Sequence, residues 1–252
     1  MGTCQHVQVG FHLKDRMLVR SYTPTRPVLP APSDPKINEH ARLNGNHSGH
    51  DEDLHAVEDG DGTFDLTVKT YFPDDNQPGG AMSNLLDCMP IGEEVEIRGP
   101  TGEIVYNGNG DFVIEGKKRH FNRVSLVLGG SGLTPGYSLI ARILLSGNDK
   151  TMIRAIDANK SQADILLRDS LKRFEDESNG QLVVTHVLSQ PEDDWKGLKG
   201  YVNKDIITAN LFPPAEDSVT FLCGPPAMIQ KAALPALKGE SPAVAAWMPQ
   251  MC

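Results

Sequence analysis

Apolar and polar residues alternate on both sides of a long polar stretch near the N-terminus. The segments "RMLVRSYTP" (16–24), "GTFDLTVKTYF" (62–72) and "EEVEIRGPTG" (93–102) have a period of two, which predicts half-buried strands. Between the last two, "PGGAMSNLLDCMP" (78–90) has apolar residues at helical spacing. Residues 1–120 are therefore predicted to form an antiparallel sheet, most simply a small barrel, with one short helix.

The pattern changes at residue 123, where apolar runs begin to alternate with helical periods. Strand, loop and helix signals repeat in "RVSLVLGGSGLTPGYSLIARILLS" (123–146), in residues 151–178 and in "SVTFLCGPPAMIQKAALPAL" (218–237). This alternation predicts a doubly wound parallel sheet over residues 121–252, with its chemistry in the loops after the strands. The strands are expected to end near Leu128, Ile156, Leu188 and Leu222.

The polar stretch between Pro27 and Gly62 carries eight acidic and two basic residues and four of the eight histidines. We expect a mobile surface loop, and we expect no metal site there because a useful site needs a rigid supporting shell. The net charge of −9 argues against nucleic-acid binding, and no apolar run is long enough to span a membrane. Neither a signal peptide nor a metal or redox motif among the four cysteines is apparent, which fits a reducing, cytoplasmic compartment.

The turn in "LVLGGSGLTPG" (126–136) has the composition of an anion cradle. Its glycines let the backbone approach a ligand closely, Thr134 is expected to cap the next helix, and Pro135 fits the first turn of that helix. A helix N-terminus after such a turn can bind a pyrophosphate. The alternative is an ordinary tight turn, and the missing P-loop lysine argues against ATP or GTP hydrolysis.

Two shorter patterns, each taken alone, indicate a binding site less specifically than this glycine turn does. In "CGPPAMI" (223–229) Cys223 ends a predicted parallel strand, Gly224 is expected to leave room for a flat ring, and Pro225 or Pro226 starts a helix. A buried hydrophobic role for Cys223 is equally compatible with this pattern. In "RSYTPT" (20–25) a guanidinium, an aromatic ring and hydroxyls could bind a phosphate and a heterocycle, although an ordinary exposed strand explains the pattern as well.

Together, and in this order, the three patterns resemble the ferredoxin–NADP reductase superfamily and, within it, the cytochrome b5 reductase group. The resemblance covers residues 5–237. Within the group, the sequence resembles the flavin domain of fungal assimilatory nitrate reductases more closely. The resemblance rests on "GFHLKDRMLVRSYTPTRPV", "GGAMSNLL", "GKKRHFNRVSLVLGGSGLTPGYSLIARILL", "IDANKSQADILLRDSL", "WKGLKGYVN" and "FLCGPPAMIQKAALPAL". It implies an FAD-binding barrel in residues 1–120 and an NAD(P)H-binding domain in residues 121–252.

The resemblance also implies roles for individual residues. Thr23, Thr134 and Cys223 would be catalytic, with Cys223 positioning the nicotinamide over the flavin. The residues that would bind FAD are Arg20, Ser21, Tyr22, Thr23, Val68, Lys69, Tyr71, Phe72, Gly80, Met82 and Ser83. The residues that would bind the nicotinamide nucleotide are Gly129, Gly130, Ser131, Gly132, Thr134, Ser189, Cys223, Gly224, Pro225 and Met228.

Ser189 bears on the choice between NADH and NADPH. Relatives that prefer NADH have an acidic residue after this strand, which would repel a 2′-phosphate. Ser189 removes that repulsion, and we expect Lys196 and Lys199 to help bind NADPH, while Asp193 and Asp194 oppose it. The sequence therefore favours NADPH and leaves NADH open.

The resemblance implies hydride transfer from NADPH to FAD, then electron transfer to a cytochrome b5-type haem and a molybdenum centre that reduces nitrate. No haem or molybdenum domain is recognisable in the sequence, and the first strands of the family's barrel and its final aromatic residue have no match. The tail after Leu237, "KGESPAVAAWMPQMC" (238–252), has no strand alternation. The alternatives are a stand-alone cytochrome b5 reductase and a remnant that holds no FAD, and a homodimer is expected only for a full-length enzyme.

Overall fold

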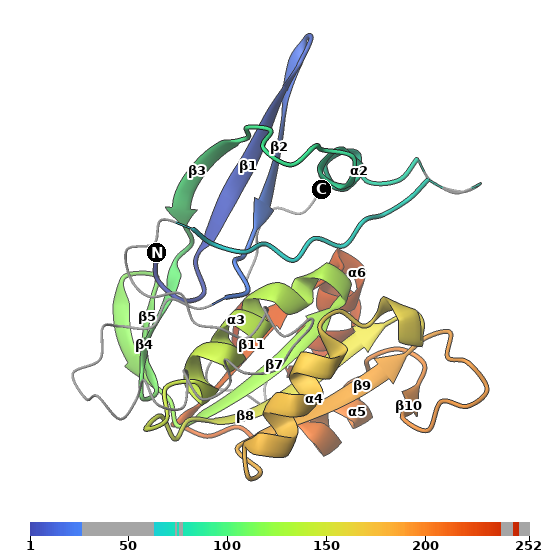
Figure 1. Cartoon of the computed structure of the whole chain (residues 1–252). Coiled ribbons are helices and arrows are strands. Elements are labelled where there is room, and N and C mark those ends of the chain that lie inside the picture. Colours follow the sequence, from blue (N-terminus) through green and yellow to red (C-terminus); the bar gives the residue numbers. More distant parts are fainter. Residues whose placement is uncertain (27–62, 74, 76–77, 238–243, 247–252) are drawn as a thin grey trace.

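The fold combines two antiparallel sheets with one parallel sheet (Figure 1). The structure is a computed structural model and describes residues 1–26, 63–73, 75, 78–237 and 244–246. The long acidic loop and most of the C-terminal tail therefore lie outside the described residues. The antiparallel strands followed by an α/β part confirm the predicted fold class.

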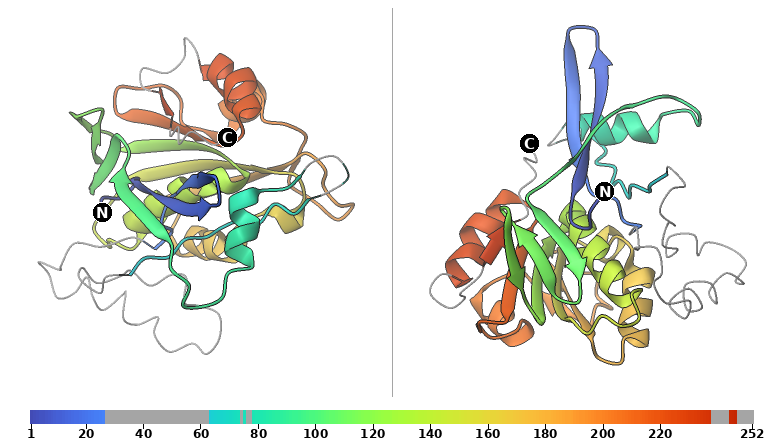
Figure 2. Two further views of the ribbon diagram at one scale, coloured as in Figure 1. Left: turned by 90° about the horizontal axis from the view of Figure 1, so that it is seen from above. Right: turned by 90° about the vertical axis from the view of Figure 1, so that its left-hand side faces the viewer.

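The N-terminal sheet projects away from the α/β part (Figures 1 and 2). It contains β1 (His6–Leu13), β2 (Arg16–Tyr22) and β3 (Glu96–Thr101) in the order β2–β1–β3. The short helix α2 (Ala81–Asp87) packs on it, so that Val7, Val9 and Met82 form a small core. This core is separate from the larger ones of the α/β part.

The strand predicted over residues 62–72 is wrong for its described part. Residues 63–73 are extended but belong to no β-ladder of the described structure. The backbone makes isolated contacts instead: Asp65 O accepts from the Thr25 N–H at 3.1 Å, and Tyr71 O accepts from the Gly80 N–H at 2.7 Å. Residues 65–70 are partly buried and Phe64, Tyr71 and Phe72 are exposed, so the alternating pattern corresponds neither to a sheet nor to one buried face.

The second antiparallel sheet packs against the α/β part. It comprises β4 (Ile104–Gly108), β5 (Asp111–Ile114) and β6 (Lys117–His120) in sequential order. The Phe112 ring lies 4.6 Å from the Tyr106 ring and 5.3 Å from the Phe221 ring, measured between centroids. Because Phe221 belongs to a strand of the parallel sheet, this hairpin shares a hydrophobic core with that sheet.

The parallel sheet is formed as the alternation predicts. Its order is β10–β9–β8–β7–β11–β12. The strands are β7 (Arg123–Gly129), β8 (Met152–Asn159), β9 (Leu182–Leu188), β10 (Leu198–Lys199), β11 (Ser218–Cys223) and β12 (Val244–Ala246). β12 pairs with β11 and lies within the tail for which no strand was expected. A strand of three residues is too short for an alternating pattern to be recognised in the sequence.

Helices cover both faces of this sheet. Residues of α3 (Leu133–Leu144) and α4 (Arg168–Glu177) share one core with β7 and β8. The opposite core contains residues of α5 (Lys204–Asn210), η4 (Ile229–Ala233) and α7 (Leu234–Leu237). The short α6 (Pro226–Met228) leads directly into η4. Among the described helices, none combines the length and hydrophobicity that a bilayer crossing requires.

A buried polar network joins β4 to the loop before β8. The Tyr106 hydroxyl donates to Asp149 Oδ2 at 2.5 Å and accepts from the Gly110 N–H at 3.0 Å. The other carboxylate oxygen, Asp149 Oδ1, accepts from the Thr151 hydroxyl at 2.7 Å. Burial, together with the bond to Asp149, raises the pKa of Tyr106, so the phenol stays protonated as a donor.

Removal of the Tyr106 hydroxyl should destabilise the fold. Tyr106→Phe leaves the buried Asp149 short of a donor and the Gly110 N–H without its acceptor, so we expect a loss of about 1–3 kcal/mol in the free energy of unfolding. Urea denaturation measures this loss. Tyr201→Phe, at a side chain that is 78% exposed, is the matched control and should change stability by less than about 0.5 kcal/mol. Equal effects of the two variants would contradict the account.

Candidate active site

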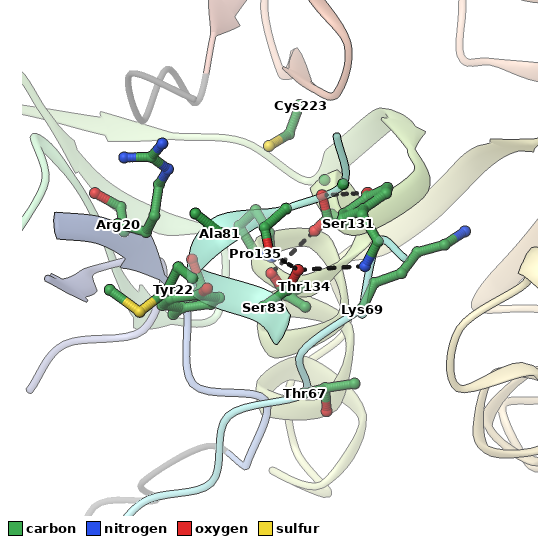
Figure 3. Close-up of a pocket in the computed structure, with 17 residues that line it drawn as sticks. Arg20, Tyr22, Thr67, Lys69, Ala81, Ser83, Ser131, Thr134, Pro135 and Cys223 are labelled. Atoms are coloured by element: carbon green, nitrogen blue, oxygen red, sulfur yellow. Dashed lines mark hydrogen bonds between the residues drawn. The ribbon is translucent and has the colours of Figure 1, made fainter. Parts of the chain in front are cut away.

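Two cavities open where the antiparallel part meets the carboxyl ends of the parallel strands. The first, the sheet-junction cavity, has a volume of about 480 Å³ and lies between β2, α2 and the start of α3 (Figure 3). The second, the strand-end cavity, has a volume of about 660 Å³ and lies over the ends of β8, β9 and β11. Both volumes are within the usual range of ligand sites.

Most of the residues singled out in the sequence line one of these cavities. Around the sheet-junction cavity lie Arg20, Ser21, Tyr22, Thr23, Lys69, Tyr71, Gly80, Met82, Ser83, Ser131, Gly132, Thr134 and Cys223. Around the strand-end cavity lie Lys69, Tyr71, Phe72, Gly129, Gly130, Ser189, Pro225 and Met228. Val68 and Gly224 line neither. The structure thus gathers residues from distant parts of the chain at two adjoining cavities.

The two glycine-containing turns pack tightly against each other. β7 pairs with β11 so that Leu128 lies opposite Cys223, and the turns leave the sheet side by side. A Cβ on Gly132 would lie 2.5 Å from the Cys223 carbonyl oxygen, which is backbone and cannot yield. A Cβ on Gly224 would lie 2.7 Å from the Met228 methyl and 2.9 Å from the Gly129 nitrogen. Glycine is therefore required at both positions by protein packing alone.

The first turn of α3 differs in one detail from the prediction. Gly132, and not Thr134, is the N-cap, and no side chain caps the helix. Thr134 lies inside the first turn, where its hydroxyl donates to Ser131 O at 3.3 Å. The prediction of a threonine cap was wrong because the 3₁₀ turn η2 (Gly130–Gly132) leads directly into α3 at Leu133, two residues before the start that a Thr134 cap would give. Pro135 in the first turn of α3 and Pro226 at the first position of α6 are confirmed.

Cys223 is a buried thiol. Only 2% of it is exposed, and burial raises its pKa to about 12. The group is therefore neutral at physiological pH, which rules out thiolate nucleophilicity as its ordinary role. What it can provide is a small apolar wall in the sheet-junction cavity.

An extended segment, residues 67–72, separates the two cavities, and Lys69 and Tyr71 line both of them. The Lys69 ammonium is 2.7 Å from Asp164 Oδ1, and the Tyr71 hydroxyl donates to Ser131 Oγ at 3.1 Å. Burial would raise the pKa of Asp164, but hydrogen bonds from Lys69 and Ser161 hold it below its usual value. These contacts fix the segment to the α/β part.

Polar groups on the opposite side of the sheet-junction cavity come from β2 and the residues after it. Within the described residues, no carboxylate forms an ion pair with Arg20, whose guanidinium donates to Val19 O at 2.8 Å. Tyr22 lies beside it, and burial raises its pKa although Arg20 acts in the other direction. The hydroxyl-bearing Thr23 and Thr134 are 6% and 8% exposed. The cavity thus combines a cation, an aromatic ring and hydroxyls.

Sequence reasoning missed several residues of the strand-end cavity. Lys160, Asp164, Tyr201 and Lys231 all line it, whereas Lys196 and Lys199, expected near Ser189, do not. Proximity in sequence to Ser189 was the wrong guide: Lys199 pairs with Leu188 but does not line the cavity, whereas Lys160, which does, follows the residue that bonds the Ser189 N–H across the sheet. Helical spacing would have found Lys231, which follows Met228 by three residues.

Comparisons with known proteins agree with this arrangement. Family models match residues 126–233 as an oxidoreductase NAD-binding domain and residues 41–106 as an oxidoreductase FAD-binding domain. The chain is 36% identical over 243 residues to NADH-cytochrome b5 reductase 3 of Rattus norvegicus, covering 93% of this chain and 71% of the relative. It is 34% identical over 241 residues to nitrate reductase (NADH) 1 of Zea mays, covering 93% of this chain and 34% of the relative.

A solved structure is similar over nearly the whole chain. The crystal structure of the cytochrome b5 reductase domain of Ulva prolifera nitrate reductase matches with a TM-score of 0.81 and 26% identity, covering 98% of this chain and 85% of that one. The chain spans only 20–34% of the length of the nitrate reductases from Hordeum vulgare, Oryza sativa and Zea mays.

The sheet-junction cavity fits the FAD that these relatives imply. Arg20 offers a cation without an acidic partner among the described residues, Tyr22 and Tyr71 offer rings, and Thr23 and Ser83 offer hydroxyls. A guanidinium suits a pyrophosphate, and aromatic rings suit a flat heterocycle. The donors present and the volume are therefore compatible with a bound flavin nucleotide.

The environment of Cys223 predicts its reactivity. With a pKa of about 12 and little exposure, Cys223 should resist alkylation by iodoacetamide at pH 8.5, whereas the exposed Cys88 should react readily. Peptide mass mapping after timed alkylation of the folded protein measures both sites. Labelling of Cys223 at the rate of Cys88 would show that the two turns do not pack as described.

The Lys69–Asp164 pair should contribute to stability in a pH-dependent way. Asp164→Asn keeps the shape and removes the charge, and we expect a loss of about 1 kcal/mol at pH 7, since both side chains are partly exposed. Because the folded pKa of Asp164 is lowered, this contribution is present above the unfolded pKa of about 3.9 and is lost as the pH falls through the folded value.

Asp176→Asn is the control for this prediction. It breaks the exposed Lys172–Asp176 pair, whose side chains are 70% and 60% exposed, and should cost less than about 0.5 kcal/mol. Urea denaturation at pH 7 and pH 3 compares the two variants. If Asp164→Asn lowered the free energy of unfolding no more than Asp176→Asn at pH 7, the Lys69–Asp164 pair would not contribute to stability as predicted.

Proposed function

The chain belongs to the family of FAD- and NAD-binding oxidoreductases that includes the cytochrome b5 reductases, and from this premise we propose that it is the reductase part of a nitrate reductase. It is a flavin-dependent NAD(P)H oxidoreductase. The proposal adds three finer points: NADPH as the preferred donor, the site residues that act on it, and a cytochrome b5-type haem as the acceptor.

One observation carries the proposal. The strand-end cavity is lined by Gly129 and Pro225, and the sheet-junction cavity by Gly132 and Cys223, so the same pair of turns borders both. A dinucleotide lying in the strand-end cavity would reach the flavin site past these turns. Such a direct approach is what hydride transfer requires, because the two reacting rings must be in contact.

The residues act by binding and orientation. When bound, FAD accepts a hydride and releases electrons singly. Arg20 would neutralise its pyrophosphate, Tyr22 would lie along its ring, and Ser83 would help hold its phosphates at the start of α2. The buried hydroxyls of Thr23 and Thr134, which line the same cavity, would act where the two rings meet, and the neutral Cys223 would hold the nicotinamide by shape.

Ser189 supports NADPH as the donor. It lines the strand-end cavity at the end of β9, where an acidic residue would repel a 2′-phosphate. Asp193 and Asp194, which counted against NADPH in the sequence, do not line this cavity. The relatives described above are named for NADH, so the proposed preference for NADPH rests on Ser189 and its neighbours alone.

The acceptor follows from the relatives. Those named above are nitrate reductases and a cytochrome b5 reductase, and we propose a cytochrome b5-type haem as the acceptor in both cases. Reduction of nitrate at a molybdenum centre, and the homodimer, would belong to the larger protein. A stand-alone cytochrome b5 reductase fits the similarities equally well. Cys4, Cys88 and Cys223 are free thiols, which supports a cytoplasmic location.

Steady-state reduction of ferricyanide tests the donor preference. The FAD-loaded protein should have a higher kcat/KM with NADPH than with NADH. Ser189→Asp should shift the ratio of the two values toward NADH by about tenfold or more, because a carboxylate beside the 2′-phosphate repels it.

The matched control is Thr208→Asp, which adds the same charge on the exposed side of α5 and should leave the ratio unchanged. A wild-type preference for NADH would overturn the NADPH assignment. Ferricyanide reduction by neither nucleotide would overturn the enzymatic proposal itself.

A further inference from the structure

The charged lining of the strand-end cavity is predominantly basic. Among the described residues that line it, the charged ones are Lys69, Lys160, Lys231 and Asp164. Lys69 and Asp164 neutralise each other at 2.7 Å. Lys160 and Lys231 form no ion pair with any residue that the structure describes, so two positive charges border this cavity in a protein whose net charge is −9.

Lys160 lies next to Ser189. It directly follows β8, and the ladder between β8 and β9 continues past the strand ends: the Ser189 N–H donates to Asn159 O at 3.1 Å, and the Gln190 N–H donates to Lys160 O at 2.8 Å. The backbone of Lys160 is thus hydrogen-bonded to the residue after Ser189. Lys160 and Ser189 are therefore neighbours across the sheet, and both line the strand-end cavity.

Lys231 reaches the cavity from another wall. It belongs to the π-helical segment η4, which directly follows Met228 of α6, and both Lys231 and Met228 line the cavity. The exposed ring of Tyr201 borders the same space. The strand-end cavity is thus bordered by Lys160 on the β8 side, by Ser189 after β9 and by Lys231 on the helical side.

Other charged residues near Ser189 in sequence are directed elsewhere. Glu192 accepts a hydrogen bond from the Gln162 N–H at 3.2 Å and does not line the cavity. Lys199 lies opposite Leu188 in the β9–β10 pair, yet its side chain is exposed outside the cavity, as is that of Lys196. Neither side chain lines the cavity that Ser189 borders.

We propose that Lys160 and Lys231 bind the 2′-phosphate of NADPH and, together with Ser189, set the preference for NADPH over NADH. The assignment rests on the proposed use of NADPH. Two ammonium groups on different walls strengthen the binding of a phosphate dianion, because each makes a charge-assisted hydrogen bond to a different phosphate oxygen. NADH lacks this phosphate and gains nothing from the two lysines.

Calorimetric titration with two adenosine nucleotides tests the assignment without turnover. Adenosine 2′,5′-bisphosphate and adenosine 5′-monophosphate differ only in the 2′-phosphate. Lys160→Met and Lys231→Met keep the apolar stem and remove the charge. Each should weaken binding of the bisphosphate about fivefold, the double variant should weaken it more, and binding of the monophosphate should stay unchanged.

Lys196→Met and Lys199→Met are the matched controls, since these lysines are close to Ser189 in sequence and outside the cavity. They should leave binding of both nucleotides unchanged. All four lysines are exposed, so no variant should alter the unfolding midpoint in urea.

The outcomes distinguish failure of the lysine assignment from failure of the NADPH proposal on which it rests. If the wild-type protein binds the bisphosphate more tightly than the monophosphate and the two cavity variants keep that difference, the lysine assignment is wrong and the NADPH proposal stands. The same conclusion follows if the controls weaken binding as much as the cavity variants. If the wild-type protein binds both nucleotides equally, NADPH specificity itself is wrong.

Discussion

The close packing of Gly132 against the backbone of Cys223 and Gly224 is the constraint on which both cavities depend. The strands that lead to these residues are neighbours in the parallel sheet, so their two turns emerge together and must share the same space. A side chain on Gly132 or Gly224 would meet backbone atoms at 2.5–2.9 Å. With glycine at both positions, the two turns form a wall that both cavities share. Thr134 and Cys223 line the sheet-junction cavity, and Gly129 and Pro225 line the strand-end cavity.

The antiparallel part completes both cavities because it is fixed to this wall at separate points. Tyr71 bonds Ser131 of the glycine turn, and Lys69 pairs with Asp164 in the loop after β8. On the other side of the molecule, Tyr106 and Asp149 join the β4–β5 hairpin to the same α/β part. These links are hydrogen bonds and an ion pair, which are directional. They therefore fix the distance and orientation between the two cavities, which burial of apolar surface alone would not do.

The sequence predicts the α/β part well, because each strand and helix there has its own hydrophobic period. It fails where tertiary contacts decide. Residues 63–73 alternate like a strand but lie beside no ladder, and Thr134 resembles a cap although the 3₁₀ turn before it moves the start of the helix to Leu133. Lys160 is remote from Ser189 in sequence and adjacent across the sheet. Only the pairing of β8 with β9 reveals that neighbourhood.

The central claim is that adjoining cavities bring a nicotinamide nucleotide into contact with bound FAD. The most direct measurement is the visible absorbance spectrum of the purified chain, incubated with FAD and desalted, before and after NADPH is added without oxygen. The account predicts flavin bands that remain after desalting and bleach when NADPH is added. A colourless protein would contradict it, because the motifs would then describe the ancestry of the chain without a working flavin site.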